Sequence, residues 1–494
     1  MKKYDTSSSF KNWLCCGLLA ALAFTSFGLQ AQVAPAVQWD RTLGGIGADQ
    51  LFDLQQTFDG GYILGGFSYS SISGDKSQNH FSVGLVDYWI IKTDANGNKE
   101  WDRTFGGIGG DLLFDLQQTS DGGFILGGNS DSGISGSKSQ TSRGQTDYWI
   151  VRLDANGNKI WDKTFGGNWL EYFRGLQQTS DGGFIIGGAS SSEVSGDKSE
   201  PRKGPVYSLD YWIIKLDSNG NKIWDKTIGG LADDFLCCLQ QTSDKGYILG
   251  GYSRSGIGGD KSGPQIGFND YWVVKVDSLG NKVWDKTYGG DKQDLLYALQ
   301  QTSDRGYILG GTSESNISGN KSQNSRGHED YWIIKTDSIG NVLWDKTIGG
   351  DYPDDVKSLQ QTTDGGYIIG GASWSNLNGD KSQNGRGHSD YWLVKLNATG
   401  AKAWDITIGG DAIEDFGGLQ QTSDGGFILG GDSQSSISGE KTQASKGSSD
   451  YWIVKLAPEV TGVKEAKANF DVAVYPNPNK GKFNLQLHNL NVPT

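Results

Sequence analysis

The sequence is poor in the residues that usually build metal and nucleophile sites. Its 494 residues include four cysteines, four histidines and one methionine. Lys and Arg total 44 against 57 Asp and Glu, which gives a formal charge of −13. A chain without a basic excess has little to offer phosphate groups, so we expect no nucleic-acid partner and no binding to anionic membranes.

Long apolar runs are equally scarce. Only segment 13–27, preceded by lysines and followed by "LQAQ", is largely apolar, and it is too short for a membrane span. We therefore predict a signal peptide at 1–31, cleaved after Ala31, and no integral membrane span. Cys15 and Cys16 stand at the start of the apolar segment, where a lipoprotein cysteine would not lie. The mature protein is predicted to be secreted or held at the cell surface.

Export normally permits disulfides, but the mature chain keeps only Cys237 and Cys238. Adjacent cysteines seldom bridge each other, so no disulfide framework is expected. We interpret both as inert buried thiols. The stability of the fold must then come from packing.

Glycine and tryptophan are abundant, and the tryptophans reveal a period. The chain has 75 glycines and 17 tryptophans, of which 14 fall into two series spaced by 60 to 63 residues. The first series is Trp39, Trp101, Trp161, Trp224, Trp284, Trp344 and Trp404. The second, in "DYW", is Trp89, Trp149, Trp212, Trp272, Trp332, Trp392 and Trp452. A strict period of this length indicates repeats of one supersecondary unit.

Each repeat carries four strand signals, typified by "LQQT", "FILGG", "DYWIVRLD" and "KIWDKTFGG". Asp-Gly and Asn-Gly turns separate the first from the second strand and the third from the fourth, because glycine accepts a positive φ at no steric cost. No segment has helical periodicity over ten or more residues. Seven such units predict an all-β fold, a seven-bladed β-propeller of four-stranded antiparallel blades over residues 37–456.

The two ends of the repeat region support ring closure. The region opens with a lone fourth strand from Val37 and ends with only three strands, so the N-terminal strand is predicted to complete the last blade. An open β-solenoid is the alternative, but it would not need that strand. The repeat resembles bacterial propeller families with "DGGY" and "DYW" blades, and is loosely similar to PQQ-type and kelch propellers. That resemblance implies architecture and leaves activity open.

A different signature follows the repeats. Residues 457–469 form a polar linker, and "VYPNPNKGKFNLQL" within 470–494 resembles the C-terminal sorting domain (type A) of type IX secretion cargo in Bacteroidetes. The matching residues are Tyr475, Pro476, Asn477, Pro478, Gly481, Phe483 and Leu485. The resemblance implies export by the type IX machinery and a partial β-sandwich-like domain. Such domains usually continue for several more strands.

An acidic residue lies four positions after the second Gly of each fourth strand. These ring acids are Asp49, Asp111, Glu171, Asp234, Asp294, Asp354 and Glu414. We expect them in the loop that enters the innermost strand, near the central channel. A carboxylate ring there could hold Ca²⁺ through oxygen ligands. The alternative is that each acid caps loop N–H groups within its own blade, and no other cofactor is indicated.

Other repeated polar residues have simpler explanations. The Asp of each "DYW" and of each "WD" recurs seven times, as a folding residue would. "DANGNK" at 94–99 echoes the start of a calcium loop but lacks its Gly and Glu, so a tight turn explains it better. His328 and His388 occupy equivalent positions in adjacent repeats. They could bind a metal, but we interpret them first as duplicated loop residues. Both are also counted among the candidate ligand-binding residues of the loop face.

Residues that depart from the repeat are the better candidates for ligand binding. Trp169, Tyr352 and Trp374 stand where other repeats are mostly small or polar, and Tyr172 lies close to Trp169 in sequence. The loops that hold them should open on one face of the propeller, where binding is usual. Their rings could stack on sugars, anchor a protein, or simply pack beneath a loop.

Two functional hypotheses follow. The first is a monomeric, secreted or surface-attached propeller that binds a glycan or a protein as an adhesion or structural module. The second is an extracellular polysaccharide lyase or hydrolase, which for hydrolysis needs a carboxylate pair about 5–10 Å apart. No non-repeated acid pair is evident in the sequence, so no catalytic residue is assigned and the binding hypothesis is preferred.

Overall fold

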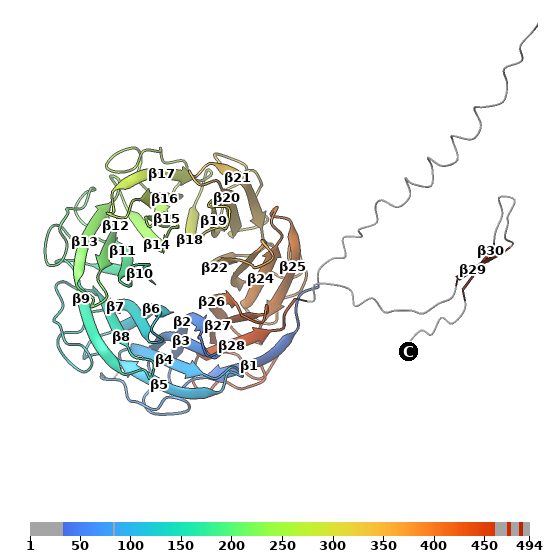
Figure 1. The fold of residues 1–494 in the computed structure, drawn as a ribbon, viewed down its shortest axis with the longest axis horizontal. Coiled ribbons are helices and arrows are strands. Elements are labelled where there is room, and N and C mark those ends of the chain that lie inside the picture. Colours follow the sequence, from blue (N-terminus) through green and yellow to red (C-terminus); the bar gives the residue numbers. More distant parts are fainter. Residues whose placement is uncertain (1–32, 83, 460–471, 476–483, 488–494) are drawn as a thin grey trace, which may run out of the picture.

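The computed structural model describes residues 33–82, 84–459, 472–475 and 484–487. The strands form seven four-stranded antiparallel sheets around a central axis (Figure 1). The predicted all-β, seven-bladed propeller is therefore confirmed. The predicted signal peptide lies outside the described residues, and no described helix is long and apolar enough to cross a membrane.

Every blade has the same order of strands from the axis outward. The innermost strands are β2 (Asp49–Gln56), β6 (Asp111–Gln118), β10 (Glu171–Gln178), β14 (Asp234–Gln241), β18 (Asp294–Gln301), β22 (Asp354–Gln361) and β26 (Glu414–Gln421). The second strands are β3 (Tyr62–Ser68), β7 (Phe124–Ser130), β11 (Phe184–Ser190), β15 (Tyr247–Ser253), β19 (Tyr307–Ser313), β23 (Tyr367–Ser373) and β27 (Phe427–Ser433). We number the blades 1 to 7 in this order.

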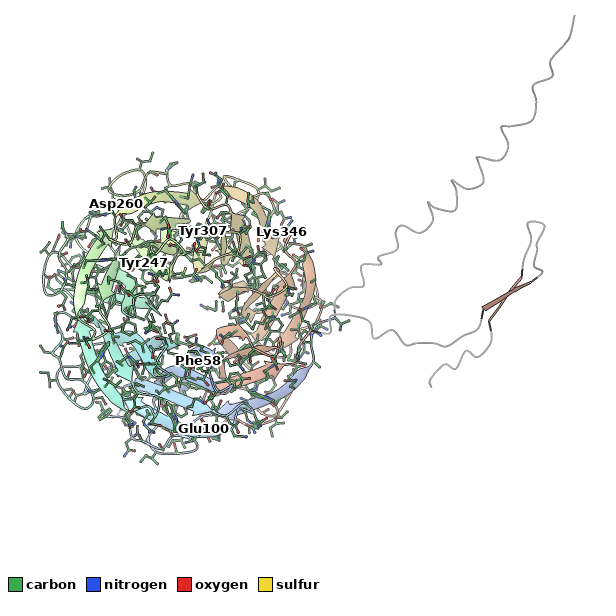
Figure 2. The ribbon with its side chains drawn as sticks, viewed as in Figure 1. Phe58, Glu100, Tyr247, Asp260, Tyr307 and Lys346 are labelled. Atoms are coloured by element: carbon green, nitrogen blue, oxygen red, sulfur yellow. The ribbon has the colours of Figure 1, made fainter. Side chains whose placement is uncertain are left out.

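The third strands carry "DYW" at their start. They are β4 (Asp87–Thr93), β8 (Asp147–Leu153), β12 (Asp210–Leu216), β16 (Asp270–Val276), β20 (Asp330–Thr336), β24 (Asp390–Leu396) and β28 (Asp450–Leu456). The outermost strands are β5 (Lys99–Phe105), β9 (Lys159–Phe165), β13 (Lys222–Ile228), β17 (Lys282–Tyr288), β21 (Val342–Ile348), β25 (Lys402–Ile408) and β1 (Val37–Leu43). In Figure 2, Glu100 and Asp260 lie at the rim and Phe58 lies beside the central opening.

The first strand of the chain closes the ring. β1 pairs with β28, so blade 7 has the order β1-β28-β27-β26 (Figure 1). Asp40 of β1 accepts hydrogen bonds from the Trp452 indole at 3.0 Å and from the Thr442 N–H at 3.0 Å. The predicted closure is confirmed. It leaves no open edge between the first and last repeats.

The "DYW" residues hold neighbouring blades together. Tyr88 donates its hydroxyl hydrogen to the carbonyl of Trp149 in the next blade at 2.9 Å, with ring centroids 4.8 Å apart. The same pair recurs around the ring and closes at Tyr451 and Trp89, at 3.0 Å and 4.9 Å. Both side chains of each pair are fully buried, so each adds apolar area as well as a satisfied polar group.

The tight turns also have a packing role. Gly220 in an Asn-Gly turn has φ of 75°, and a Cβ there would lie 2.8 Å from the Trp161 ring of the preceding blade. Gly122 in an Asp-Gly turn has φ of 85° with open space around it. Lys245 and Arg305 take φ values of 66° and 67° at the equivalent place in blades 4 and 5. The turn needs its backbone conformation even where the residue is not glycine.

Beyond the propeller, β29 (Val472–Tyr475) pairs with β30 (Asn484–Leu487) as an antiparallel hairpin. Tyr475 and Leu485 of the predicted sorting motif belong to these strands. Its other five residues, Pro476, Asn477, Pro478, Gly481 and Phe483, lie outside the described residues. The assignment to a type IX sorting domain therefore stays a prediction.

Candidate ligand-binding channel

Each innermost strand contains a bulge at the same position, and the residue at that position varies between blades. In β2 the pairing with β3 shifts between Leu51 and Asp53, which leaves Phe52 without a cross-strand partner. The same shift occurs in all seven blades. A bulge re-aims its side chain, and here the side chains lie on the strands that surround the axis. This bulge ring consists of Phe52, Phe114, Arg174, Cys237, Tyr297, Lys357 and Gly417.

Blades 1 to 4 line the channel with aromatic rings. Phe52 lies 5.1 Å from Phe114 of the next blade, edge to face, and 5.2 Å from Phe67 in its own blade. Phe235 stacks on Tyr252 at 5.4 Å. The Arg174 guanidinium lies 5.0 Å from the ring centres of both Phe114 and Phe235, bridging the two groups. Half-buried rings in this arrangement offer flat apolar faces to a ligand.

Blades 5 to 7 line the channel with charged groups. The Lys357 ammonium lies 5.0 Å over the Tyr297 ring, and its charge acts on Asp355 and Asp415. Burial raises the pKa of Asp355 and of Asp415, while Lys357 opposes this rise. In the adjoining blade 4, burial raises the pKa of the Cys237 thiol to about 12, while the charge of Arg174 opposes this rise. The innermost strands of blades 1 to 4 therefore carry most of the aromatic rings, together with the Arg174 charge, and those of blades 5 to 7 carry Lys357, Asp355 and Asp415.

The end of the channel beside the Asp-Gly turns is bounded by glutamines from all blades. We call these the glutamine crown: Gln55, Gln117, Gln177, Gln240, Gln300, Gln360 and Gln420. Each crown Oε1 accepts the backbone N–H of the second glutamine in the next blade at 2.6–2.7 Å. A cavity of about 300 Å³ lies inside the crown.

The second glutamines form an opposite belt. Each accepts the N–H of a turn residue in the preceding blade at 2.8–2.9 Å. The hydrogen bonds of the crown and those of the second glutamines both cross the junction of the chain ends. There Gln420 accepts the Gln56 N–H, and Gln56 accepts the Ser423 N–H. The repeated "LQQTSDGG" phrase therefore binds every blade to both of its neighbours.

Two carboxyl groups interrupt the symmetry of this end. Asp53 and Asp115 lie in blades 1 and 2, and share a hydrogen bond with each other. Burial raises the pKa of Asp53 to about 6, and burial together with the Asp53 charge raises the pKa of Asp115 well above its usual range. Burial and the mutual repulsion of the two carboxyl groups therefore both favour the protonated form of this pair.

The ring acids are buried rather than exposed to the channel. Each is the first residue of an innermost strand, not a loop residue as expected, and is fully buried. Asp49 accepts the Gly45 N–H at 2.7 Å and the Ser70 hydroxyl at 3.1 Å, all within blade 1 or its entry loop. The other six acids accept an N–H from the equivalent glycine. This is the capping arrangement that the sequence offered as the alternative.

A buried lysine accompanies each ring acid. Lys76 of "GDKS" lies 5.3 Å over the Trp89 ring, near the charges of Asp49, Asp87 and Asp102. Burial lowers the pKa of Lys76 to about 8, while those carboxylates oppose the fall. No cluster of three or more His, Cys, Asp or Glu side chains suited to a metal occurs among the described residues. Calcium binding by the ring stays a prediction.

The aromatic residues singled out on the loops occupy separate places. Trp169 packs edge to face on Tyr207 at 4.9 Å in blade 3. Tyr352 and Trp374 are both exposed in blade 6, where the Trp374 N–H donates to the carbonyl of Pro353 at 3.0 Å. Tyr172 faces Phe235 in the channel wall at 5.9 Å. The structure therefore brings Tyr172 into the channel and leaves the other three on the loop face.

The two histidines differ in their surroundings. His328 lines a cavity of about 270 Å³ with Lys292, Glu314, Glu329 and Pro353. Burial raises the pKa of Glu329 to about 7, helped by Asp355 and by a hydrogen bond with Glu314. His388 is exposed, and its backbone N–H donates to the carbonyl of Ala412 at 2.8 Å. His328 therefore adjoins a cavity that also contains Glu314 and Glu329.

Sequence reasoning did not identify the bulge ring or the acid pair Glu314–Glu329. The signal was present, because the two positions before each "LQQ" read Phe-Asp, Phe-Asp, Arg-Gly, Cys-Cys, Tyr-Ala, Lys-Ser and Gly-Gly. That variation stands beside an invariant phrase. It marks the place where the blades differ most in charge and shape.

Comparison with known proteins assigns no family. No protein-family profile matches the chain. The regulatory protein FlaEY of Caulobacter vibrioides is 23% identical over 201 residues, which is 38% of this chain and 20% of that protein. The chain therefore matches about a fifth of the length of this curated relative.

Three solved structures show a limited similarity to this chain. BamB from Moraxella catarrhalis is 13% identical with a TM-score of 0.38, covering 85% of this chain and 99% of that chain. Sqt1 from Chaetomium thermophilum is 10% identical with a TM-score of 0.40, covering 86% and 100%. Hydrazine synthase from Kuenenia stuttgartiensis is 9% identical with a TM-score of 0.46, covering 78% and 94%.

Proposed function

We propose that this protein is a secreted or cell-surface propeller that binds a glycan at its channel, as a monomeric adhesion or structural module. The predicted signal peptide and sorting motif support export through the type IX machinery. Protein ligands remain the other member of the same binding hypothesis. The chemistry of the channel favours the glycan.

The observation that carries the proposal is the asymmetry of the bulge ring. Phe52 and Phe114 of the bulge ring supply aromatic faces, with Phe235 beside them on β14. Lys357 of the ring and Asp415 on β26 supply exposed charges in blades 6 and 7. Sugar rings present apolar C–H faces and polar hydroxyl edges, which match these two sides. A ring built only to fold would have no need to differ between blades.

A glycan array with a matched pair of variants tests this function. Phe114→Ala removes one channel ring, and Ile160→Ala removes an exposed side chain from the outermost strand of the same blade. We expect Phe114→Ala to weaken glycan retention at least tenfold and Ile160→Ala to leave it unchanged. Failure of the folded wild-type protein to retain any glycan, with a protein captured at the channel instead, would overturn the glycan assignment.

One observation supports the alternative of a carbohydrate-active enzyme. Glu329 lines one cavity together with Glu314 and His328. Its pKa is raised to about 7, and a raised carboxyl pKa is typical of a general acid. The two glutamates are close enough to share a hydrogen bond, which is nearer than the roughly 5 Å used in retaining hydrolysis. Turnover of a polysaccharide panel that is abolished by Glu329→Gln would establish the enzyme; absence of turnover would dismiss it.

A further inference from the structure

The end of the channel inside the glutamine crown carries an excess of hydrogen-bond donors. A backbone N–H needs an oxygen acceptor, so the contact made by each crown Oε1 also settles the orientation of its amide. The Nε2 groups of the crown are then the amide atoms left for the lumen. The seven crown glutamines line one cavity of about 300 Å³, and their NH₂ groups are the amide atoms not used in the contact to the next blade.

Backbone donors add to this excess on one side only. The Leu116 and Leu176 N–H groups donate to Asp53 and Asp115 of the preceding blades at 3.1 Å and 2.6 Å. The equivalent N–H groups in blades 4 to 7 belong to Leu239, Leu299, Leu359 and Leu419. The preceding blades carry no carboxylate at that place, since their residues are Gly175, Cys238, Ala298 and Ser358.

The carboxyl pair completes the site on the opposite side. Asp53 and Asp115 supply acceptor oxygens where blades 4 to 7 supply donors. A ligand that satisfies both sides must donate and accept hydrogen bonds, as a hydroxyl group does. The cavity lining contains no Lys or Arg among the described residues, so an anionic ligand would meet carboxyl groups without a compensating cation.

Building on the proposed glycan-binding function, we infer that the glutamine crown and the Asp53–Asp115 pair bind one neutral sugar unit of that glycan. The crown amides donate to its hydroxyl oxygens, and the carboxyl pair accepts its hydroxyl hydrogens. The cavity volume of about 300 Å³ lies at the lower end of the range for small-ligand sites, which is about 300–1,000 Å³. The bulge-ring aromatics would hold the adjoining part of the chain.

Each crown glutamine has two roles, which are to accept a backbone N–H through Oε1 and to present an NH₂ group to the lumen. Replacing the amide by a carboxylate separates them. In Gln300→Glu an oxygen remains for the Gln361 N–H, so the belt contact at 2.6 Å is kept while the lumen NH₂ is lost. Gln301→Glu is the matched control, because this second glutamine accepts the Ser243 N–H at 2.8 Å on the belt outside the crown. Both variants add one negative charge to the same strand.

The measurement is calorimetric titration of the mature full-length protein. The probes are neutral pentasaccharides (cellopentaose, laminaripentaose, mannopentaose and chitopentaose) and the anionic pentagalacturonate. We expect a neutral pentasaccharide to bind, Gln300→Glu to weaken it at least tenfold, Gln301→Glu to change it less than twofold, and pentagalacturonate not to bind. The thermal midpoint of each variant checks that it is folded.

The outcomes separate this inference from the function on which it rests. Equal effects of the two variants, or preferential binding of pentagalacturonate, would overturn the neutral-sugar site while leaving glycan binding in place. Absence of binding to every probe and every array glycan by folded protein would overturn both.

Discussion

The Asp of each "WD" pair is expected to be a main stabilising residue of its blade, and Asp285→Ala tests this. Asp285 in β17 is buried, with 7% of its surface exposed. One carboxylate oxygen accepts the Trp272 indole N–H at 3.1 Å and the Ser262 N–H at 2.9 Å; the other pairs with Lys282 at 2.9 Å. Burial alone would raise the pKa of Asp285, but these three contacts hold it below its usual value.

The loss can be estimated from the partners left behind. Trp272 is fully buried, so its N–H without an acceptor costs about 1–3 kcal/mol. The partly buried Ser262 N–H adds about 1 kcal/mol. Lys282 is about a third exposed and can be hydrated, so its ion pair adds little. We expect Asp285→Ala to lower the free energy of unfolding by about 2–4 kcal/mol.

Urea denaturation followed by tryptophan fluorescence and by far-UV circular dichroism measures this loss. Coincidence of the two probes is needed, because a large repeat protein need not unfold in two states. Asp285→Asn is the matched variant, since its amide oxygen can still accept from Trp272, and it should lose about half as much. A loss below about 0.5 kcal/mol for Asp285→Ala would refute the reasoning, because a buried indole N–H cannot be left unpaired at so small a cost.

Three further predictions concern the turns, the acids and the metal hypothesis. Lys245→Gly should raise stability by about 0.5–1 kcal/mol in the same denaturation assay, because glycine removes the cost of φ 66°; no gain would show that the turn is not strained. Burial raises the pKa of Asp49, Asp234 and Asp294 to about 6 and that of Asp354 to about 7. The stabilisation that these raised pKa values give the folded state is fully present below pH about 4 and is lost as the pH rises through 6–7. The melting temperature should therefore rise when the pH falls from 8 to 5, and a fall in melting temperature over that range would contradict the assignment. EDTA should leave the melting temperature unchanged, because each ring acid already accepts a backbone N–H of its entry loop through one carboxylate oxygen; a decrease would restore the calcium hypothesis.

The blade architecture could be predicted because each of its signals is local. The Asp-Gly and Asn-Gly turns, the third strands with "DYW" and the lone strand from Val37 all correspond to observed elements. The burial of the ring acids inside their blades could not be predicted in the same way. An innermost strand begins at the acid itself, so Asp49 starts the ladder with β3 opposite Ser68 and turns into the blade.

The channel residues escaped prediction for a related reason. Strict alternation assigns every second residue of a strand to one face, but the bulge at Phe52 inserts one extra residue and shifts the alternation. Leu54 therefore faces the core while Phe52 and Asp53 are both half-exposed. Contacts between blades, such as Arg174 with Phe114 and Phe235, depend on ring closure and have no signature in a single repeat.

The bulge also explains how a sevenfold skeleton can hold an asymmetric site. Gln55 and Gln56 each bond to a neighbouring blade, so a change there disturbs the ring on both sides. A bulge residue has no cross-strand partner in its own sheet, and Phe52, Arg174 and Gly417 can occupy equivalent positions without altering the pairing on either side. The repeated phrase therefore fixes the shape of the channel, and the bulge residues can vary without disturbing that shape. Substitutions between blades at the bulge should change ligand preference far more than stability.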